Sequence, residues 1–321
     1  MKVGIIGAGS IAGTMAGTIR EMDCAQNYAV AARDYGRAAE FAQTYGFEKA
    51  YGSYEELVED AGVELVYIAT PHSHHYEHIK LCLNHGKHVL CEKSFTVNES
   101  QAREVLALAR EKKLLLTEAI WTRYMPMRKT LDSVLSSGVI GRPYMLTANL
   151  GYIISGKERI MRPELAGGAL LDVGIYPLNF ASMVFGDEVD SITGTAVMTE
   201  TGVDAQNSIT ITYKDGKMAA LCSSAMGLSD RRGIIYGDNG FIEVENINNC
   251  EGIRVYDRSR NMIASYDTPK QISGYEYEVE ACLRAIKEGA LECPEMPHEE
   301  TLRMMGWMDE LRRQWGLVYP M

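Results

Sequence analysis

Three side chains in this sequence have the types needed to move a proton on or off a hydroxyl group. Lys93 follows an apolar run and Glu92, and Asp172 and Tyr176 stand four residues apart in a glycine-rich stretch. If that stretch is helical, the aspartate and the tyrosine share one face. An ammonium group, a carboxylate and a phenol converging on one point would handle the proton of a carbinol during hydride transfer.

Each of these residues also has a structural explanation. Glu92 and Lys93 could form a salt bridge at the surface, Asp172 is a residue type that caps helices, and Tyr176 could be a packed aromatic side chain. For Asp172 and Tyr176 taken alone, the structural role is the more common one. The chemical hypothesis therefore depends on the elements that would bring the three side chains together.

A glycine-rich turn near the start of the sequence predicts a dinucleotide site. Residues 7–12, Gly-Ala-Gly-Ser-Ile-Ala, follow an apolar run and precede an amphipathic segment. Such a site requires a tight turn, a close approach of the backbone to the pyrophosphate and a small residue where the helix packs on the strand. Gly7, Gly9 and Ala12 meet these needs in order. Glycines also occur in ordinary turns, so the prediction depends on the position between a strand and a helix.

The end of the second apolar run should lie at the adenosine ribose. Asp34 would accept hydrogen bonds from the ribose hydroxyls of NAD, whereas Arg33 suits the additional phosphate of NADP. Because Arg33 comes first and can stack on adenine while it pairs with phosphate, we predict NADP, with NAD as the alternative. A solvated Arg-Asp turn is the structural explanation.

Six of the seven histidines lie between residues 72 and 88. His74 and His78 have the i, i+4 spacing of a metal pair, but the segment has no HExxH glutamate and no nearby cysteine ligands, so we predict no metal site. His72 is nearest to the end of a predicted strand and is expected to touch a cofactor. The structural explanation, a position on a helix surface, is preferred for His75, His78 and His85.

The elements that would position these groups form a parallel sheet. Residues 1–119 alternate short apolar runs with helical periodicity, which is the pattern of successive βα units. Capping-box patterns at Ser53-x-x-Glu56 and Thr96-x-x-Glu99 predict two helix starts. The predicted strands are Val3–Ile6, Tyr28–Ala32, Leu65–Ala69, His88–Cys91 and Leu114–Thr117.

Strand-like segments follow one another in the second part of the chain. Asp215-Gly216 predicts a hairpin turn, residues 237–240 predict a second turn, and two helical segments close the chain. We therefore predict an α/β protein. Residues 1–119 form an N-terminal Rossmann domain with a doubly wound parallel sheet that binds NAD(P). Residues 120–321 form an α+β domain with a large, mainly antiparallel open-faced sheet for substrate binding and dimerisation.

Composition and charge argue against several classes of function. The chain has 321 residues, of which 46% are hydrophobic and 23% charged, as expected of two globular domains. Its net charge of -11 repels polyanions, so neither nucleic acid nor an anionic membrane surface is an expected partner. No uninterrupted apolar run approaches the roughly 20 residues of a membrane span. Seven dispersed cysteines without a CxxC pair indicate reduced thiols, and together these features predict a cytoplasmic protein.

The motifs, taken together, resemble those of the Gfo/Idh/MocA oxidoreductase family over essentially the whole chain. The glycine turn is generic, but a Glu-Lys pair combined with Asp-x-Gly-x-Tyr is specific. The segment from Glu118 to Tyr124 narrows the resemblance to the dimeric dihydrodiol dehydrogenase branch. The residues that carry it are Gly7-Ala8-Gly9, Thr70-Pro71, Glu92-Lys93, the segment Glu118–Tyr124 and the segment Gly167–Tyr176.

The resemblance implies roles for individual residues. Lys93 and Tyr176 would be the catalytic pair, with Tyr176 as acid and base and Lys93 either lowering its basicity or binding the substrate oxygen. Asp172 would orient the substrate or its proton partner. A tyrosine at 176, where many members have histidine, resembles branches that use NADP. Positions that line the cofactor in relatives are Gly7, Gly9, Ser10, Ile11, Arg33, Thr70, Pro71, His72, Glu92, Trp121 and Arg123.

The implied function is NAD(P)-dependent hydride transfer to or from CH–OH or CH–CH groups of a cyclic polyol, aldose or trans-dihydrodiol, in a homodimer or higher homo-oligomer. The alternatives are a non-catalytic NAD(P)-binding regulatory protein and an oxidoreductase for another substrate class, such as a tetrapyrrole. A pure sensor has no need for Lys93, Asp172 and Tyr176 together, which favours the enzyme. Ser94 departs from the family's usual Glu-Lys-Pro, which bears on the placement of Lys93.

Overall fold

A computed structural model describes residues 1–320 of the chain, which divide into two compact units. The first unit contains Met1–Tyr124 together with Gln271–Met305, and the second contains Met125–Lys270 together with the residues from Gly306 on. The fold class predicted from the sequence is confirmed: one sheet is parallel, and the other is mixed and mainly antiparallel.

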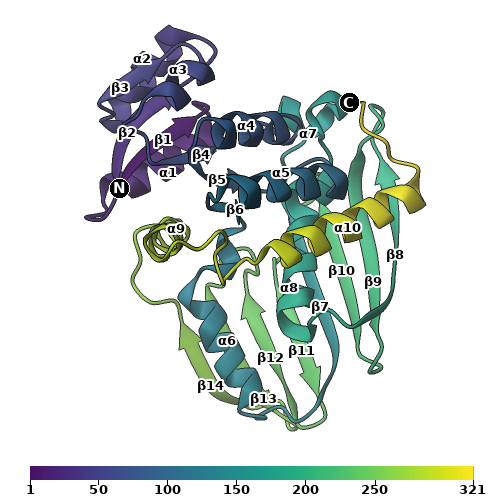
Figure 1. Cartoon of the computed structure of the whole chain (residues 1–321). Coiled ribbons are helices and arrows are strands. Elements are labelled where there is room, and N and C mark those ends of the chain that lie inside the picture. Colours follow the sequence, from purple (N-terminus) through teal and green to yellow (C-terminus); the bar gives the residue numbers. More distant parts are fainter. Residues whose placement is uncertain (321) are drawn as a thin grey trace. The chain divides into compact units, whose positions relative to one another are not determined.

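The first unit is built on a six-stranded parallel sheet in the order β3-β2-β1-β4-β5-β6 (Figure 1). Its central strands are buried on both faces, as expected of parallel strands covered by helices. The order reverses between β1 and β4, and ligands of doubly wound sheets bind beyond the carboxyl ends of the strands at such a point. The strands are β1 (Lys2–Ile6), β2 (Gln26–Ala31), β3 (Lys49–Tyr51), β4 (Leu65–Ile68), β5 (His88–Glu92) and β6 (Leu116–Ala119).

Helices connect these strands, and the first residues of α3 and α5 test the two predicted capping boxes. The capping box at Ser53 and Glu56 is present at the start of α3. The one predicted at Thr96 is wrong, because Asn98 caps α5 through Gln101 N, while the Thr96 hydroxyl donates to the Asn98 carbonyl. The helices of this part are α1 (Ser10–Arg20), α2 (Tyr35–Tyr45), α3 (Tyr54–Glu59), α4 (His72–Asn84), α5 (Glu99–Lys112) and the 3-10 turn η1 (Trp121–Arg123).

A segment from the C-terminal part of the sequence completes the first unit. Helix α9 (Glu276–Glu288) packs on β5, and Leu116 N donates to the Leu291 carbonyl at 3.1 Å. The His298 ring nitrogen Nε2 lies 2.8 Å from the Leu116 carbonyl. The division into units therefore differs from a single cut at residue 119, since residues 271–305 pack with the Rossmann sheet.

The second unit is built on an eight-stranded sheet in the order β14-β13-β12-β11-β7-β10-β9-β8. Strands β7 and β10 pair in parallel and the other pairs are antiparallel. The predicted turns at Asp215-Gly216 and at residues 237–240 both connect antiparallel neighbours. The strands are β7 (Pro143–Gly151), β8 (Val189–Met198), β9 (Asp204–Tyr213), β10 (Met218–Ser224), β11 (Gly233–Gly237), β12 (Gly240–Glu245), β13 (Gly252–Asp257) and β14 (Met262–Asp267).

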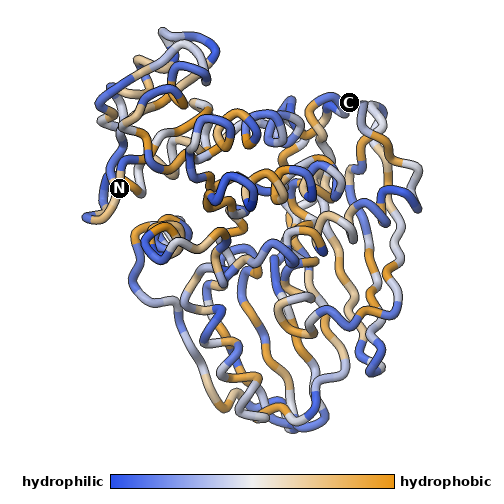
Figure 2. Tube along the Cα trace, viewed as in Figure 1, coloured by the Kyte–Doolittle hydropathy of each residue, from blue (hydrophilic) through white to orange (hydrophobic). Residues whose placement is uncertain are grey.

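One face of this sheet is covered by helices and the other is open. Burial alternates along β10, and α8 packs on β7 and β10. Apolar residues are concentrated along the strands of both sheets (Figure 2). The helical segments of this unit are α6 (Pro126–Ser136), α7 (Glu158–Met161), the 3-10 turn η2 (Pro163–Leu165), the π-helix η3 (Leu170–Gly174), α8 (Ile175–Phe185) and the end of α10 (His298–Trp315).

The helical stretch Pro163–Phe185 is long and apolar enough, by length and composition, to cross a membrane. In the fold, 94% of its apolar window is buried inside the protein. A core helix of a globular unit has the same composition, and α8 has this position against its sheet.

Candidate functional site

The turn after β1 brings the backbone of three strands close together. Gly7 N donates to the Ala31 carbonyl at 2.9 Å, and Gly7 has a φ of 106°. A Cβ at this position would lie 2.9 Å from the Ala69 carbonyl oxygen. Only glycine adopts this conformation at such a close approach without strain, which is the first requirement of a dinucleotide turn.

The N-terminus of α1 has the properties of a phosphate site. Gly9 is the N-cap residue and no side chain caps the helix, and the first turn contains no acidic residue. A Cβ built on Gly9 would meet no atom within 4 Å, so space lies beside the backbone. The amide groups at Ser10 and Ile11 begin the helix, and such uncapped N–H groups together with the helix dipole favour an anion. These residues fit the pyrophosphate of a dinucleotide.

The two residues after β2 that bear on the choice between NAD and NADP, Arg33 and Asp34, have different environments. Asp34 is the N-cap of α2 and its Oδ1 accepts from Arg37 N at 2.7 Å. Arg33 follows the strand with an exposed side chain. Sequence reasoning missed Arg37, whose guanidinium donates to the Ala8 carbonyl of the glycine turn at 3.0 Å. Its position in the first turn of the helix after β2 was the available signal.

The histidine cluster after β4 corrects one prediction. His75 does not lie on the surface of α4: it is fully buried, and its two ring nitrogens lie 2.8 Å from the Thr70 and Ser94 carbonyl oxygens. Burial lowers the pKa of His75 to about 4, so the neutral ring donates to one of these carbonyls at a time. His75 thereby links the segment after β4 to the segment after β5.

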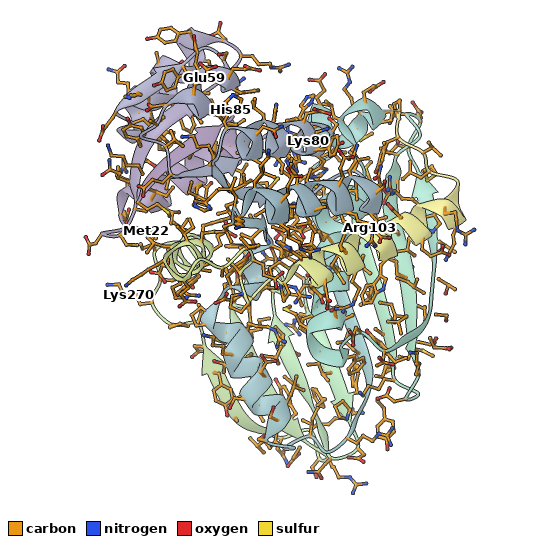
Figure 3. All side chains as sticks on the ribbon, viewed as in Figure 1. Met22, Glu59, Lys80, His85, Arg103 and Lys270 are labelled. Carbon is orange, nitrogen blue, oxygen red and sulfur yellow. The ribbon has the colours of Figure 1, made fainter. Side chains whose placement is uncertain are left out.

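The neighbouring histidines differ among themselves in exposure. His78 is half-buried rather than on the surface, with Nδ1 3.0 Å from the Thr70 hydroxyl and its ring against Tyr54. Burial, and then the neighbouring His74, lowers the pKa of His78 to about 4. His85 lies exposed at the end of α4, as expected (Figure 3). Residues 1–320 contain no group of three His, Cys, Asp or Glu side chains placed to bind a metal ion.

Glu92 and Lys93 do not form a simple surface ion pair. Glu92 is buried at the end of β5, where its carboxylate accepts hydrogen bonds from the Tyr67 hydroxyl and from Lys93 N. Burial, and then the charge of Glu92, raises the pKa of Tyr67, so the phenol stays protonated and donates. Lys93 follows the strand as a half-buried residue, and its peptide bond to Ser94 is cis. The carboxylate therefore orients the backbone from which the lysine extends.

The turn after β6 contains two further predicted cofactor residues. Trp121 stacks on Tyr275 with 4.3 Å between ring centroids. Arg123 forms an ion pair with Glu300, and both side chains are 9% exposed. This pair gives Arg123 a structural partner within the first unit, and its cofactor role stays a prediction.

Glu118, on β6, should make stability depend on pH. It is fully buried, Phe95 N donates to its Oε1 at 3.1 Å, and its Oε2 has no hydrogen-bond partner within residues 1–320. Burial raises its pKa to about 7. The folded state therefore binds the proton more tightly than the unfolded state, and this contribution to stability is lost as pH rises from about 4.5 to about 7.

Replacing Glu118 by Gln should remove this pH dependence. The amide resembles the protonated acid, so at pH 8 we expect the free energy of unfolding of the variant to exceed that of the wild type by about 3 kcal/mol. Urea unfolding at pH 5 and pH 8 measures the difference. Glu111→Gln, at a side chain that is 71% exposed, is the control and should change neither value. Parallel pH profiles for Glu118→Gln and wild type would contradict the assignment.

In the second unit, Asp172 and Tyr176 lie on either side of the point where a π-helix becomes an α-helix. Asp172 lies in the π-helix η3 and Tyr176 in the first turn of α8, and both residues are buried. A π-turn in a continuous helix is rare and occurs frequently at functional sites. The stretch is helical, which is the condition for the prediction that the two residues share one face.

A buried aspartate that sequence reasoning missed supports the start of this helix. Asp204 Oδ2 accepts from Leu170 N at 2.8 Å and from the Asn207 amide at 2.9 Å. Burial raises the pKa of Asp204 to about 6. A Cβ on Gly168, whose φ is 105°, would lie 2.2 Å from Asp204 Oδ1. The two adjacent glycines thus allow the chain to pass the aspartate and enter the π-helix.

Asp172 has a cationic partner from the loop that precedes it. Arg159, in the short helix α7, donates through Nη1 to Asp172 Oδ1 at 2.6 Å. The segment from Tyr152 to Arg162 contains two arginines, and their spacing does not indicate which of them faces the aspartate. The sequence pattern alone therefore could not predict the ion pair between Arg159 and Asp172.

Known proteins share this architecture and the order of its parts. Residues 1–120 match the model of an oxidoreductase family with an NAD-binding Rossmann fold, and residues 129–243 match the GFO/IDH/MocA C-terminal domain. Among solved structures, a 3-ketoreductase from Actinomadura kijaniata in complex with NADP and TDP-benzene superposes with a TM-score of 0.91 at 24% identity, covering 98% of each chain. An aldose-aldose oxidoreductase from Caulobacter crescentus superposes with a TM-score of 0.88 at 18% identity, covering 98% of this chain and 97% of the other.

Sequence relatives extend the likeness over the full length. A trans-1,2-dihydrobenzene-1,2-diol dehydrogenase of Xenopus tropicalis is 34% identical, with 99% of each chain covered. The enzyme of the same name from Homo sapiens is 35% identical, covering 100% of this chain and 98% of its own. The chain belongs to the GFO/IDH/MocA family of NAD(P)-dependent oxidoreductases.

Proposed function

We propose that the protein is an NADP(H)-dependent dehydrogenase acting on a carbinol or carbonyl carbon of a cyclic polyol, an aldose or a trans-dihydrodiol. The observation that carries the proposal is the identity of 34–35% over the whole chain to trans-1,2-dihydrobenzene-1,2-diol dehydrogenases. The presence of Lys93, Asp172 and Tyr176 together supports catalysis over a purely regulatory role.

The residues around α1 and α2 support NADP as the cofactor. Gly7 allows the tight turn after β1, and Gly9 leaves room for the pyrophosphate at the helix N-terminus. The Asp34 carboxylate already accepts a helix-capping hydrogen bond, which reduces its capacity to bind a ribose hydroxyl of NAD. Arg33 and Arg37, on either side of the Asp34 cap, are both exposed, and a guanidinium group is suited to binding the additional phosphate of NADP. Ser10, Ile11, Thr70, Pro71, His72 and Trp121 are the further proposed cofactor contacts.

The proposed chemistry needs one proton-transfer group and two supporting groups. A bound NADP(H) would supply the hydride acceptor or donor for the carbinol carbon. Tyr176, as the phenolate, takes the hydroxyl proton of the carbinol while the hydrogen on carbon leaves with its bonding electrons as hydride, so that the carbonyl forms. In the reverse direction the phenol gives the proton back. Lys93 binds the substrate oxygen or lowers the basicity of the phenol, and Asp172 orients the substrate.

The open face of the eight-stranded sheet supports a homodimer. Phe241 and Tyr256 stack there with ring centroids 4.5 Å apart, beside Tyr236. On the same rows, Met145 and Met218 are more than 40% exposed. An exposed apolar patch on a soluble fold is typical of an interaction surface. We therefore propose that two copies associate through this face, which the molecular mass in solution tests.

A substrate panel tests the function. The purified protein is mixed with NADP⁺ or NAD⁺ and with trans-1,2-dihydrobenzene-1,2-diol, D-glucose or myo-inositol, and in the reverse direction with NADPH and diacetyl, with nicotinamide absorbance as the readout. We expect turnover with at least one of these substrates and a preference for NADP⁺. Binding of NADP⁺ without turnover on any of them would instead indicate a non-catalytic NAD(P)-binding regulator.

A further inference from the structure

We propose that Arg159 is a positioning residue of the reaction. Its Nη1 keeps the Asp172 carboxylate charged and oriented, and its remaining N–H groups bind an oxygen of the substrate. The inference rests on the proposed function, in which Asp172 orients the substrate. It adds a residue on a different element, the short helix α7, to the group that handles the substrate.

The geometry of the ion pair carries the first half of the proposal. Arg159 Nη1 and Asp172 Oδ1 are 2.6 Å apart, and the Asp172 side chain is only 6% exposed. A carboxylate buried to this extent stays charged because cationic and hydrogen-bonding neighbours compensate for the lost water. Removing the guanidinium would therefore favour the neutral acid and free its rotation.

The second half of the proposal, that Arg159 binds the substrate, rests on the N–H groups that do not bond to Asp172. A guanidinium has five N–H groups in a fixed plane. Within residues 1–320, the one hydrogen bond of the Arg159 side chain is the bond from Nη1 to Asp172. The side chain is 37% exposed, so its other donors are accessible from solvent. Those donors lie next to the carboxylate, where a substrate oriented by Asp172 would place an oxygen.

The backbone that follows Arg159 is hydrogen-bonded to the segment that leads to Asp172. Gly168 N donates to the Ile160 carbonyl at 2.8 Å, and Gly167 N donates to the Arg162 carbonyl at 3.1 Å. A Cβ on Gly167 would lie 2.4 Å from the Ile160 oxygen. The guanidinium therefore starts from a backbone with a fixed position relative to the π-helix, which a surface loop does not normally provide.

Arg162, three residues further on, is a matched control in the same loop. It pairs with Glu158 and Glu164, and all three side chains are more than 50% exposed. Exposed ion pairs of this kind contribute little to stability or geometry. Arg162 has the same charge as Arg159 without a buried partner.

The test compares Arg159→Gln, Arg159→Lys and Arg162→Gln by kcat and KM with NADP⁺ and trans-1,2-dihydrobenzene-1,2-diol. We expect Arg159→Gln to lower kcat by about 10- to 100-fold and to raise KM for the diol by about 10-fold, as for the loss of charge-assisted hydrogen bonds. Arg159→Lys restores the charge but not the planar fork, so kcat should recover more than KM. Arg162→Gln should stay within about twofold of wild type, as expected for exposed pairs.

A second measurement keeps the inference separate from the proposed function. In protein with ¹³C-labelled aspartate, with Asp172→Asn giving the assignment, Arg159→Gln should raise the titration midpoint of the Asp172 carboxyl by about one unit or more. If wild-type protein turns over none of the panel, the proposed function fails and this midpoint still decides the pairing. Wild-type kcat, KM and midpoint in Arg159→Gln would overturn the inference.

Discussion

Tyr176→Phe is expected to lower kcat by about 10²- to 10⁴-fold while the Kd for NADP⁺ stays within about twofold, because the substitution removes only the hydroxyl to which we assign the proton transfer. The ring still fills its position, since Tyr176 is 8% exposed and phenylalanine keeps the same shape without the hydroxyl. Single-turnover kinetics with NADP⁺ and the best substrate of the panel measure the chemical step, and fluorescence titration measures cofactor affinity.

The control for this variant is Tyr213→Phe. Tyr213 is a second buried tyrosine of the same unit, and its hydroxyl donates to the Ala181 carbonyl at 3.4 Å. This variant should keep wild-type kcat, since the Tyr213 hydroxyl bonds to a backbone carbonyl and has no proposed role in the reaction. Equal kcat for Tyr176→Phe and wild type would remove Tyr176 from the mechanism, whereas equal losses in both variants would indicate a general effect of removing a buried hydroxyl.

The parts of the fold that followed from sequence are those whose signal is local. All five predicted strands of the parallel sheet match β1, β2, β4, β5 and β6 within two residues at each end, because continuous apolar runs mark strands buried on both faces. The predicted strand Leu114–Thr117 is shifted by two residues from β6 (Leu116–Ala119). Strand β3 was missed, since Lys49–Tyr51 is a three-residue edge strand with no buried residue.

Features set by contacts between distant residues could not be read from the pattern. The assignment of Gln271–Met305 to the first unit depends on bonds such as that of Leu116 N to Leu291 O. His75 has the sequence context of a surface helix residue, yet carbonyl groups from two loops surround its ring. The cap at Thr96 failed because Asn98, two residues later, competes for the same helix start.

In the candidate site, too, the features set by adjacent residues were predicted and those set by distant residues were not. Motifs located the glycine turn, Glu92-Lys93 and the helix that contains Asp172 and Tyr176, because each depends on a few adjacent residues. The groups that support them are remote in sequence: Tyr67 bonds to Glu92, and Asp204 bonds to the amide of Leu170. Composition and spacing do not specify such partners, so positioning residues are the class that a single sequence predicts least well.

Lys93→Met is the second substitution with a large expected effect. The methylene part of the side chain is retained and the charge is lost, so we expect kcat to fall by about 10²- to 10⁴-fold, the range for a group that acts on the transferred proton. If Lys93 lowers the basicity of the phenol, the rising limb of the kcat profile moves to higher pH, because a nearby cation favours the phenolate. If Lys93 binds the substrate oxygen, KM rises and the limb stays in place. Lys80→Met is the charge-matched control and should behave as wild type, since Lys80 lies on α4 (Figure 3) and its ammonium pairs with Glu104 of α5.

The double variant Lys93→Met/Tyr176→Phe decides whether the two side chains act on one substrate. Groups that serve the same transition state are strongly non-additive, because once one is removed the other has little left to assist. We therefore expect the double variant to be no more than about tenfold slower than the slower single variant. Losses that multiply in full would mean that lysine and tyrosine contribute independently. The tyrosine would then need another partner to activate it, and the ion pair of Arg159 and Asp172 in the same unit is the candidate.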